Sequence, residues 1–209
     1  VERLGGRAIL QGDSYDEAAL LAREIEAKEG RVFVHPYDDL DVIAGQGTVG
    51  MEILRQHRGS LDAIFVPVGG GGLVAGVAAY VKRISPATRV IGVEPDDANC
   101  LAAALAANAP VDIGPVGLFA DGVAVRKAGR IPFEIVRDRI DGIVTVGIDE
   151  ICAAIRDIFD DTRSIAEPAG ALAVAGMKRW VEREGVRGAA LVAIDSGANM
   201  NFDRLRHVC

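Results

Sequence analysis

The chain has few cysteines, few aromatic residues and no cluster of histidines. Its 209 residues contain only three cysteines, Cys100, Cys152 and Cys209, and none belongs to a C-x-x-C pair. The sequence therefore supports neither a disulfide framework nor a zinc site, and we expect a reduced, cytoplasmic setting. The three histidines show no H-x-x-x-H spacing, which argues against metal catalysis.

The chain also lacks runs of positive charge and long apolar segments. Lys and Arg number 23 against 30 Asp and Glu, which gives a formal charge of −7. Nucleic acids and anionic membranes need clustered positive charge, so we expect neither as a partner. No apolar run approaches the roughly 20 residues that a membrane-spanning helix needs. Half of the residues are hydrophobic, which is enough for a substantial core.

Short apolar runs alternate with longer segments of helical period, which predicts an α/β fold with an open, mainly parallel sheet flanked by helices. Residues 1–41 read as a small βαβ unit, with strands at 7–10 and 31–34 around a helix that Asp13 or Ser14 caps and that ends near Lys28. We expect the boundary between the two units in the segment 35–41. Residues 42–209 form the larger unit.

The larger unit shows the same alternation throughout. Its predicted strands are 63–68, 89–94, 142–146 and 189–194. Its predicted helices are 43–56, 73–84, 99–107, 132–140, 151–159 with Asp149 as cap, and 168–184.

Four consecutive glycines, Gly69, Gly70, Gly71 and Gly72, separate a buried strand from a helix. A turn without Cβ atoms brings several backbone N–H groups close to one anion, and the helix start adds its positive dipole end. One or two glycines would be read as a tight turn, but four at a strand end favour a phosphate cradle. No Lys-Ser or Lys-Thr follows, so the turn is not a P-loop.

A nicotinamide-binding Rossmann domain is a competing interpretation of the same turn. Gly70, Gly72 and Ala75 satisfy a loosened dinucleotide fingerprint, and Glu94 ends the next strand, where a ribose-binding acid is expected.

A second polar segment, Ser196-Gly197-Ala198-Asn199, follows the last predicted strand. In a parallel sheet it shares an edge with the glycine turn, which places a hydroxyl near a bound phosphate compound. Taken alone, this segment reads equally well as an ordinary turn.

Six motifs in order carry a resemblance over essentially the whole chain. They are Ala-Gly-Gln-Gly-Thr, Pro-Val-Gly-Gly-Gly-Gly-Leu, Gly-Val-Glu-Pro, Ala-Asp-Gly-Val, Ala-Glu-Pro-Ala-Gly-Ala and Ser-Gly-Ala-Asn-x-Asn-Phe. Together they strongly resemble the threonine ammonia-lyase (threonine dehydratase) family, fold-type II pyridoxal-phosphate enzymes of the tryptophan synthase β-like group. Residues 117–120 and 199–202 look closest to the biosynthetic branch.

The resemblance implies pyridoxal 5'-phosphate as cofactor. It implies that the turn Gly69–Gly72 and Leu73 hold the phosphate and that Ser196 hydrogen-bonds the pyridine nitrogen. A hydroxyl cannot keep that nitrogen protonated as an aspartate can, which favours elimination of a β-hydroxyl over transamination. Matching motifs place three further residues as neighbours of cofactor or substrate, namely Gln46, Gly122 and Glu167.

Two departures from the family pattern shape our expectations. Some relatives bind a divalent cation through a Glu that resembles Glu94 and an acid six residues later, where this chain has Cys100; we expect no metal site here. The family's Schiff-base lysine, in Ser-Phe-Lys-x-Arg, and its C-terminal regulatory domain find no match. We therefore expect a chain truncated at both ends, with residues 1–41 the remnant of a small mobile domain, 42–209 an incomplete cofactor-binding domain, and no catalytic residue of its own.

The function that the resemblance implies is deamination of L-threonine to 2-oxobutanoate and ammonia in isoleucine biosynthesis. We expect the parent protein to be this lyase and the chain alone to be inactive. A serine dehydratase or serine racemase of the same fold is the nearest alternative. The family also implies a homo-oligomer, a dimer or a tetramer, acting on a small amino acid.

Overall fold

The computed structural model describes residues 1–12 and 15–207. The proposed caps Asp13 and Ser14 lie outside the described residues, as does Cys209. The chain divides into two compact units, Val1–His35 and Pro36–Cys209. No helix in the described ranges is both long and apolar enough for a membrane crossing.

The first unit holds a short 3₁₀ helix, η1 (Glu2–Leu4), and one long helix, α1 (Tyr15–Glu29). The helix agrees with the sequence, but the strands expected at 7–10 and 31–34 are wrong, because neither segment is a strand. A strand needs a neighbouring backbone to satisfy its N–H and C=O groups. Both segments are instead exposed: Leu10 is 94% accessible and Val32 is 89% accessible.

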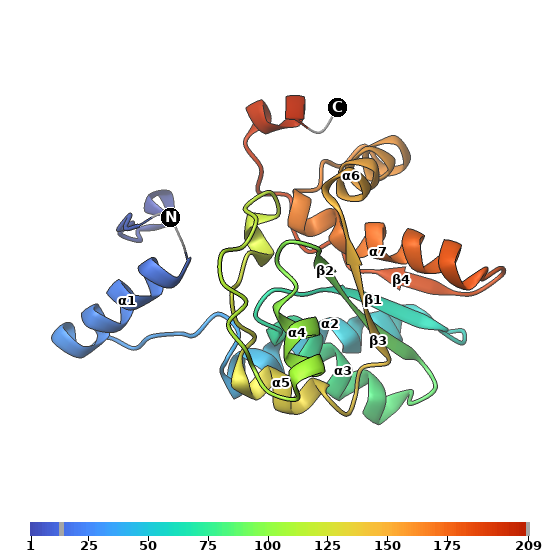
Figure 1. Ribbon diagram of the computed structural model, residues 1–209, viewed down its shortest axis with the longest axis horizontal. Helices are drawn as coiled ribbons and strands as arrows, with labels where there is room; N and C mark the ends of the chain where they lie inside the picture. Colours follow the sequence, from blue (N-terminus) through green and yellow to red (C-terminus); the bar gives the residue numbers. More distant parts are fainter. Residues whose placement is uncertain (13–14, 208–209) are drawn as a thin grey trace. The chain divides into compact units, whose positions relative to one another are not determined.

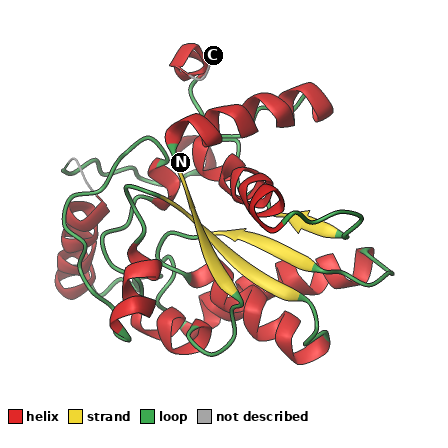
Figure 2. Cartoon of the chain, turned by 45° about the vertical axis from the view of Figure 1, so that its right-hand side comes forward, coloured by secondary structure: helices red, strands yellow, loops and turns green. Residues whose placement is uncertain are grey.

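The second unit is built on one parallel sheet, as the sequence predicts. Its strands are β1 (Ala63–Pro67), β2 (Arg89–Pro95), β3 (Gly142–Val146) and β4 (Leu191–Ala193), in the order β3-β2-β1-β4 (Figures 1 and 2). All three pairings are parallel. The central strand β1 is buried along its whole length, which explains its unbroken apolar sequence.

Helices cover both faces of this sheet (Figure 1). They are α2 (Leu40–Gln56), α3 (Gly72–Ile84), α4 (Cys100–Ala107), α5 (Arg130–Val136), α6 (Ile148–Thr162) and α7 (Pro168–Glu184), with 3₁₀ turns η2 (Asp121–Val123) and η3 (Phe202–His207). Phe65 on β1 packs in the core beneath α6 and α7, whereas its neighbour Ile64 packs with α2 to α5. Successive residues of β1 thus serve opposite cores.

Three helices, α2, α5 and α6, start two or three residues earlier than the sequence interpretation, and side-chain hydrogen bonds explain the starts of α2 and α6. The Asp39 carboxylate accepts the N–H of Asp41 and of Val42, at 2.9 and 3.0 Å, so α2 begins at Leu40. The expected cap Asp149 of α6 is wrong. That helix starts at Ile148, and the Glu150 carboxylate accepts the N–H of Gly147 at 2.8 Å. Helix α5 starts and ends earlier than expected, at Arg130 and Val136.

Helices α2 and α3 cross at glycines that let their backbones touch. A Cβ on Gly76 would lie 2.5 Å from the Gly47 nitrogen and would overlap the Ile43 carbonyl oxygen. A Cβ on Gly50, one turn further along α2, would lie 3.2 Å from Val81. Both helices are therefore fixed by direct backbone contact, and any side chain at Gly76 must force them apart.

We predict that Gly76→Ala destabilises the protein by at least about 2 kcal/mol, because the overlap is with backbone atoms that cannot rotate away. Gly45→Ala is the matched control: it lies on α2, the other helix of this crossing, with nothing within 4 Å of its Cβ position. It should be neutral or stabilising by up to about 1 kcal/mol. Urea unfolding followed by circular dichroism measures both, and equal stability of the two variants would show that the crossing is looser than described.

Candidate functional site

The candidate site lies at the carboxyl edge of the sheet, where β1 leads into the glycine turn and β4 leads to Ser196. Phe65 on β1 pairs with Ala193 on β4, and the Ile194 N–H donates to the Phe65 carbonyl at 3.1 Å. The residues that follow these two strands therefore leave the sheet at the same edge, as expected for neighbouring parallel strands.

Each glycine of the turn faces a close neighbour. A Cβ on Gly69 would lie 3.1 Å from the Val123 Cα, and one on Gly71 would lie 2.9 Å from the Pro132 Cβ. Gly71 also has φ +96°, a conformation that side chains disfavour. The turn thus requires glycine for packing as well as for any ligand.

Gly70 and Gly72 both face Tyr37, which precedes α2. A Cβ on Gly70 would overlap the Tyr37 ring, and one on Gly72 would lie 2.9 Å from the Tyr37 Cα. The sequence interpretation missed Tyr37, since a lone tyrosine 33 residues upstream carries no signal of this contact.

The backbone N–H groups of the turn fit an anion. Helix α3 begins at Gly72, and its N-cap Gly71 has no side chain to bond the first N–H groups. In the part of the chain that the structure describes, no hydrogen bond is donated by the N–H of residues 69–74. Such a run of donors at the positive end of a helix suits a phosphate group.

A second group of residues converges on Glu167, just before α7. Its carboxylate accepts the Asn199 N–H at 2.9 Å, and its own N–H donates to the Gly197 carbonyl at 3.0 Å. A Cβ on Gly122 would lie 3.4 Å from the Glu167 carboxylate. The Ser196 hydroxyl lies 3.5 Å from the Ala169 carbonyl oxygen, a long hydrogen bond. The structure therefore brings Gly122, Glu167 and Ser196 together.

Gln46 stands apart from these residues. It lies in the second turn of α2, and its nearest described contact is with Gly76, where its carbonyl carbon is 2.9 Å from a Cβ position. The described contacts do not bring its side chain to the glycine turn.

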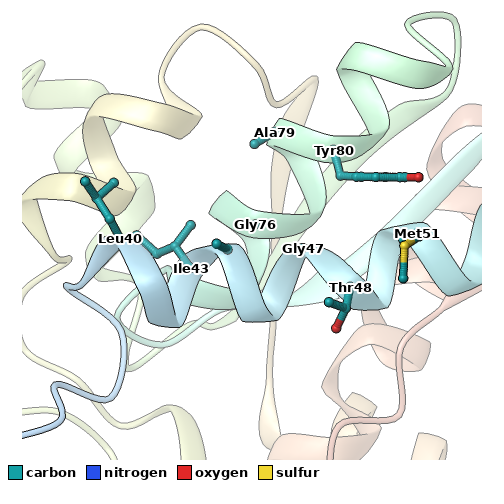
Figure 3. Close-up of a pocket in the computed structure, with 9 residues that line it drawn as sticks. Leu40, Ile43, Gly47, Thr48, Met51, Gly76, Ala79 and Tyr80 are labelled. Carbon is teal, nitrogen blue, oxygen red and sulfur yellow. The ribbon is translucent and has the colours of Figure 1, made fainter.

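A groove of about 470 Å³ runs along helices α2 and α3 (Figure 3). Leu40 lies at one end of it, and Tyr80 and Met51 lie at the other. None of the four turn glycines lines it, and the Thr48 hydroxyl in its wall already donates to the Gly45 carbonyl at 2.6 Å. The groove is apolar and separate from the candidate site.

Glu94 is fully buried and caps helix α4. Its two carboxylate oxygens accept the N–H groups of Leu101 and Ala102 at 2.7 and 2.9 Å. Burial raises the pKa of Glu94 to about 7. Because both oxygens are occupied inside the core, the carboxylate does not reach a ribose, which weighs against the nicotinamide interpretation.

Cys100 connects this cap to the glycine turn. Its buried thiol donates to the Gly69 carbonyl at 3.4 Å. Burial, together with the nearby Glu94 carboxyl, raises the pKa of the thiol to about 12, so it stays protonated and able to donate. Among the described residues, no three His, Cys, Asp or Glu side chains form a group that could hold a metal ion.

Two lysines on long helices are held in ion pairs. The Lys82 ammonium lies 2.7 Å from Asp141 and donates to the Thr88 carbonyl at 2.9 Å. Lys178 on α7 pairs with Asp157 on α6. As the sequence predicts, Lys82 is directed away from the edge that carries the glycine turn, because Asp141 and Thr88 precede strands β3 and β2.

Comparison with known proteins gives a family and close relatives. The family model "Pyridoxal-phosphate dependent enzyme" matches residues 1–197. The biosynthetic L-threonine dehydratase of Burkholderia multivorans is 55% identical over 98% of the chain and 40% of its own length. The chloroplastic biosynthetic threonine dehydratase of Arabidopsis thaliana is 56% identical over the whole chain and 35% of its own length. The chain thus spans about two-fifths or less of these curated relatives.

Solved structures agree with this family. The processed form of threonine deaminase isoform 2 from Solanum lycopersicum superposes with a TM-score of 0.95 at 45% identity, over 99% of the chain and 57% of that structure. Maize serine racemase superposes with a TM-score of 0.87 at 29% identity, over 99% and 63%. The fold is therefore that of the fold-type II pyridoxal-phosphate enzymes.

Glu94 gives a prediction for pH. Its folded pKa near 7 exceeds the ordinary value of 4.5, so the folded state holds a proton that the unfolded state has lost between pH 4.5 and 7. Stability contributed by this group is full below pH 4.5 and falls as pH rises, by about 3 kcal/mol once pH exceeds 7. Glu94→Gln removes this dependence while keeping one acceptor oxygen.

Urea unfolding of both forms from pH 4.5 to 8 tests this prediction. The stability advantage of the wild type over Glu94→Gln should shrink steadily across that range. A constant difference would mean that Glu94 is ionised throughout.

Proposed function

This chain belongs to the family of pyridoxal-phosphate dependent enzymes, and from that premise we propose that the protein carrying it deaminates L-threonine to 2-oxobutanoate and ammonia in isoleucine biosynthesis. The observation that carries the proposal is the glycine turn with its unpartnered N–H groups. It occurs in a chain that is 55% identical to a biosynthetic threonine dehydratase.

In this proposal the N–H groups of Gly69 to Gly72 and of Leu73 hold the cofactor phosphate. Ser196, at the same edge of the sheet, donates to the pyridine nitrogen. Its hydrogen bond with the Ala169 carbonyl, at 3.5 Å, is long enough to be exchanged for that partner at small cost. Bound pyridoxal phosphate supplies an electron sink that acidifies the substrate Cα proton and lets the β-hydroxyl leave.

The residues around Ser196 have supporting roles in the proposal. Glu167 binds the Asn199 N–H and the Gly197 carbonyl, and so fixes the segment that carries the Ser196 hydroxyl. Gly122 allows η2 to approach Glu167 closely. Gln46 remains a proposed neighbour of cofactor or substrate, supported only by its motif.

Ser196→Ala should weaken cofactor binding about fivefold, the worth of one hydrogen bond near 1 kcal/mol, and should slow deamination more than it lowers stability. Ser164→Ala, an exposed serine between α6 and α7, is the control and should change neither. Cofactor titration and 2-oxobutanoate formation by the full-length protein are measured. An unaltered rate in Ser196→Ala would remove Ser196 from the site.

We further propose that the lysine that binds the cofactor covalently lies outside these 209 residues and that the chain alone is inactive. The ion pairs of Lys82 with Asp141 and of Lys178 with Asp157 support this. Borohydride reduction of the full-length protein followed by peptide mass spectrometry should find the pyridoxyl group on another lysine. A stoichiometric label on a lysine of this chain would contradict the proposal.

Threonine is favoured over serine as substrate by the names of the relatives at 55 and 56% identity. Similarity to maize serine racemase, at 29% identity, keeps serine dehydration or racemisation as the second candidate. Comparing kcat/KM for the two amino acids, with a chiral assay for D-serine, separates these activities.

We also propose that the full-length protein is a cytoplasmic homo-oligomer, a dimer or a tetramer. Light scattering of the full-length protein tests the oligomeric state, and the localisation of a tagged copy tests the compartment.

A further inference from the structure

The ring of Tyr37 lies between two glycine segments that are themselves hydrogen-bonded. On one side it occupies the space next to Gly70, where the three atoms nearest a Cβ would all belong to the ring. On the other side, the ring lies 3.0 Å from a Cβ position on Gly129. The Gly129 N–H donates to the Gly70 carbonyl at 2.9 Å. Tyr37 is thus packed against the turn and against the segment that holds it.

The two residues after Tyr37 fix its backbone at the amino ends of two helices. The Asp38 carboxylate accepts the N–H groups of Arg130 and Ile131, at 3.2 and 2.8 Å, at the start of α5. Asp39 caps α2 in the same way. Since these consecutive side chains bind the starts of two different helices, the chain that directly follows Tyr37 is anchored to both α5 and α2.

A turn of four glycines needs such support. Glycine loses more conformational freedom on ordering than any other residue, and no side chain of the turn can contribute a contact. The N–H groups bind an anion well only if they are already aligned, because any ordering on binding reduces the affinity. Tyr37 contacts two of the four glycines, more than any other residue among the nearest neighbours of the turn.

We propose that Tyr37 is a positioning residue for the phosphate cradle: its ring packs against Gly70 and its backbone against Gly72, and the ring holds Gly70 in the conformation that presents the N–H groups of the turn to the cofactor phosphate. The inference rests on the proposed role of the turn. In this proposal Tyr37 fills the space where a Cβ of Gly70 or Gly72 would lie, and the ring is the reason that position 70 must be glycine.

The affinity of the full-length apoprotein for pyridoxal 5'-phosphate relative to pyridoxal tests the proposal, because that ratio isolates the phosphate contribution. Tyr37→Ala should lower this ratio about tenfold, which corresponds to the loss of about one hydrogen bond to a charged group. Tyr37→Phe keeps the ring and should retain the ratio. Tyr80→Ala, in α3 away from the turn, is the control for general loss of packing and should also retain it.

A double-mutant cycle locates the effect on the glycine. Gly70→Ala in the wild type places a methyl group into the ring and should lower the ratio, whereas Gly70→Ala combined with Tyr37→Ala should be no worse than Tyr37→Ala alone. Such rescue is not expected of a residue that merely stabilises the fold. Thermal unfolding of the apoproteins confirms that each variant is folded.

The outcomes separate this inference from the proposed function. Equal wild-type affinity for pyridoxal and its phosphate would contradict the phosphate cradle itself. A clear wild-type preference for the phosphate that survives Tyr37→Ala, or additive losses in the double variant, would leave the cradle in place and overturn the role of Tyr37. A loss in Tyr37→Phe equal to that in Tyr37→Ala would also overturn it, because the ring would not be the cause.

Discussion

A turn that contains no side chains, at the end of the most buried strand, is the constraint on which the second unit depends. Because such a turn has no side chains, neighbouring segments must supply all of its packing. Its N–H groups are left without partners inside the turn. Val123 from η2 and Pro132 from α5 pack against Gly69 and Gly71, and the Cys100 thiol binds the Gly69 carbonyl. The long segment between α4 and β3 returns to the carboxyl edge of the sheet and provides the first two of these contacts.

Elements whose signal is local were predicted well from the sequence. Strand β3 and helix α7 have the expected bounds, because an apolar run and a Pro-initiated apolar helix carry their own information. The strands expected around α1 failed because a strand exists only with a partner backbone, which periodicity does not reveal. Asp149 was expected to cap α6, but the next residue, Glu150, accepts the N–H at the helix start instead.

For the candidate site, the sequence predicted which segments meet but not what holds them. The glycine turn and Ser196 were placed at one edge because parallel strands share a direction, and the pairing of β1 with β4 bears this out. The competing nicotinamide interpretation made Glu94 a ribose-binding acid, yet Glu94 caps α4, because its orientation depends on a helix that begins six residues later. Its burial, not its place in a motif, decides its chemistry.

The exposed segments that flank α1 have a practical consequence for handling the chain by itself. Leu10, Val32 and Val34 are 94, 89 and 72% accessible, in two short stretches that pair with no strand among the described residues. Exposed apolar segments that pair with no strand can pair with a similar segment, including one of a second molecule. Purified alone at high concentration, the chain would therefore tend to self-associate through these stretches, and lysine or proline at Val32 would improve its solubility without touching the sheet of the second unit.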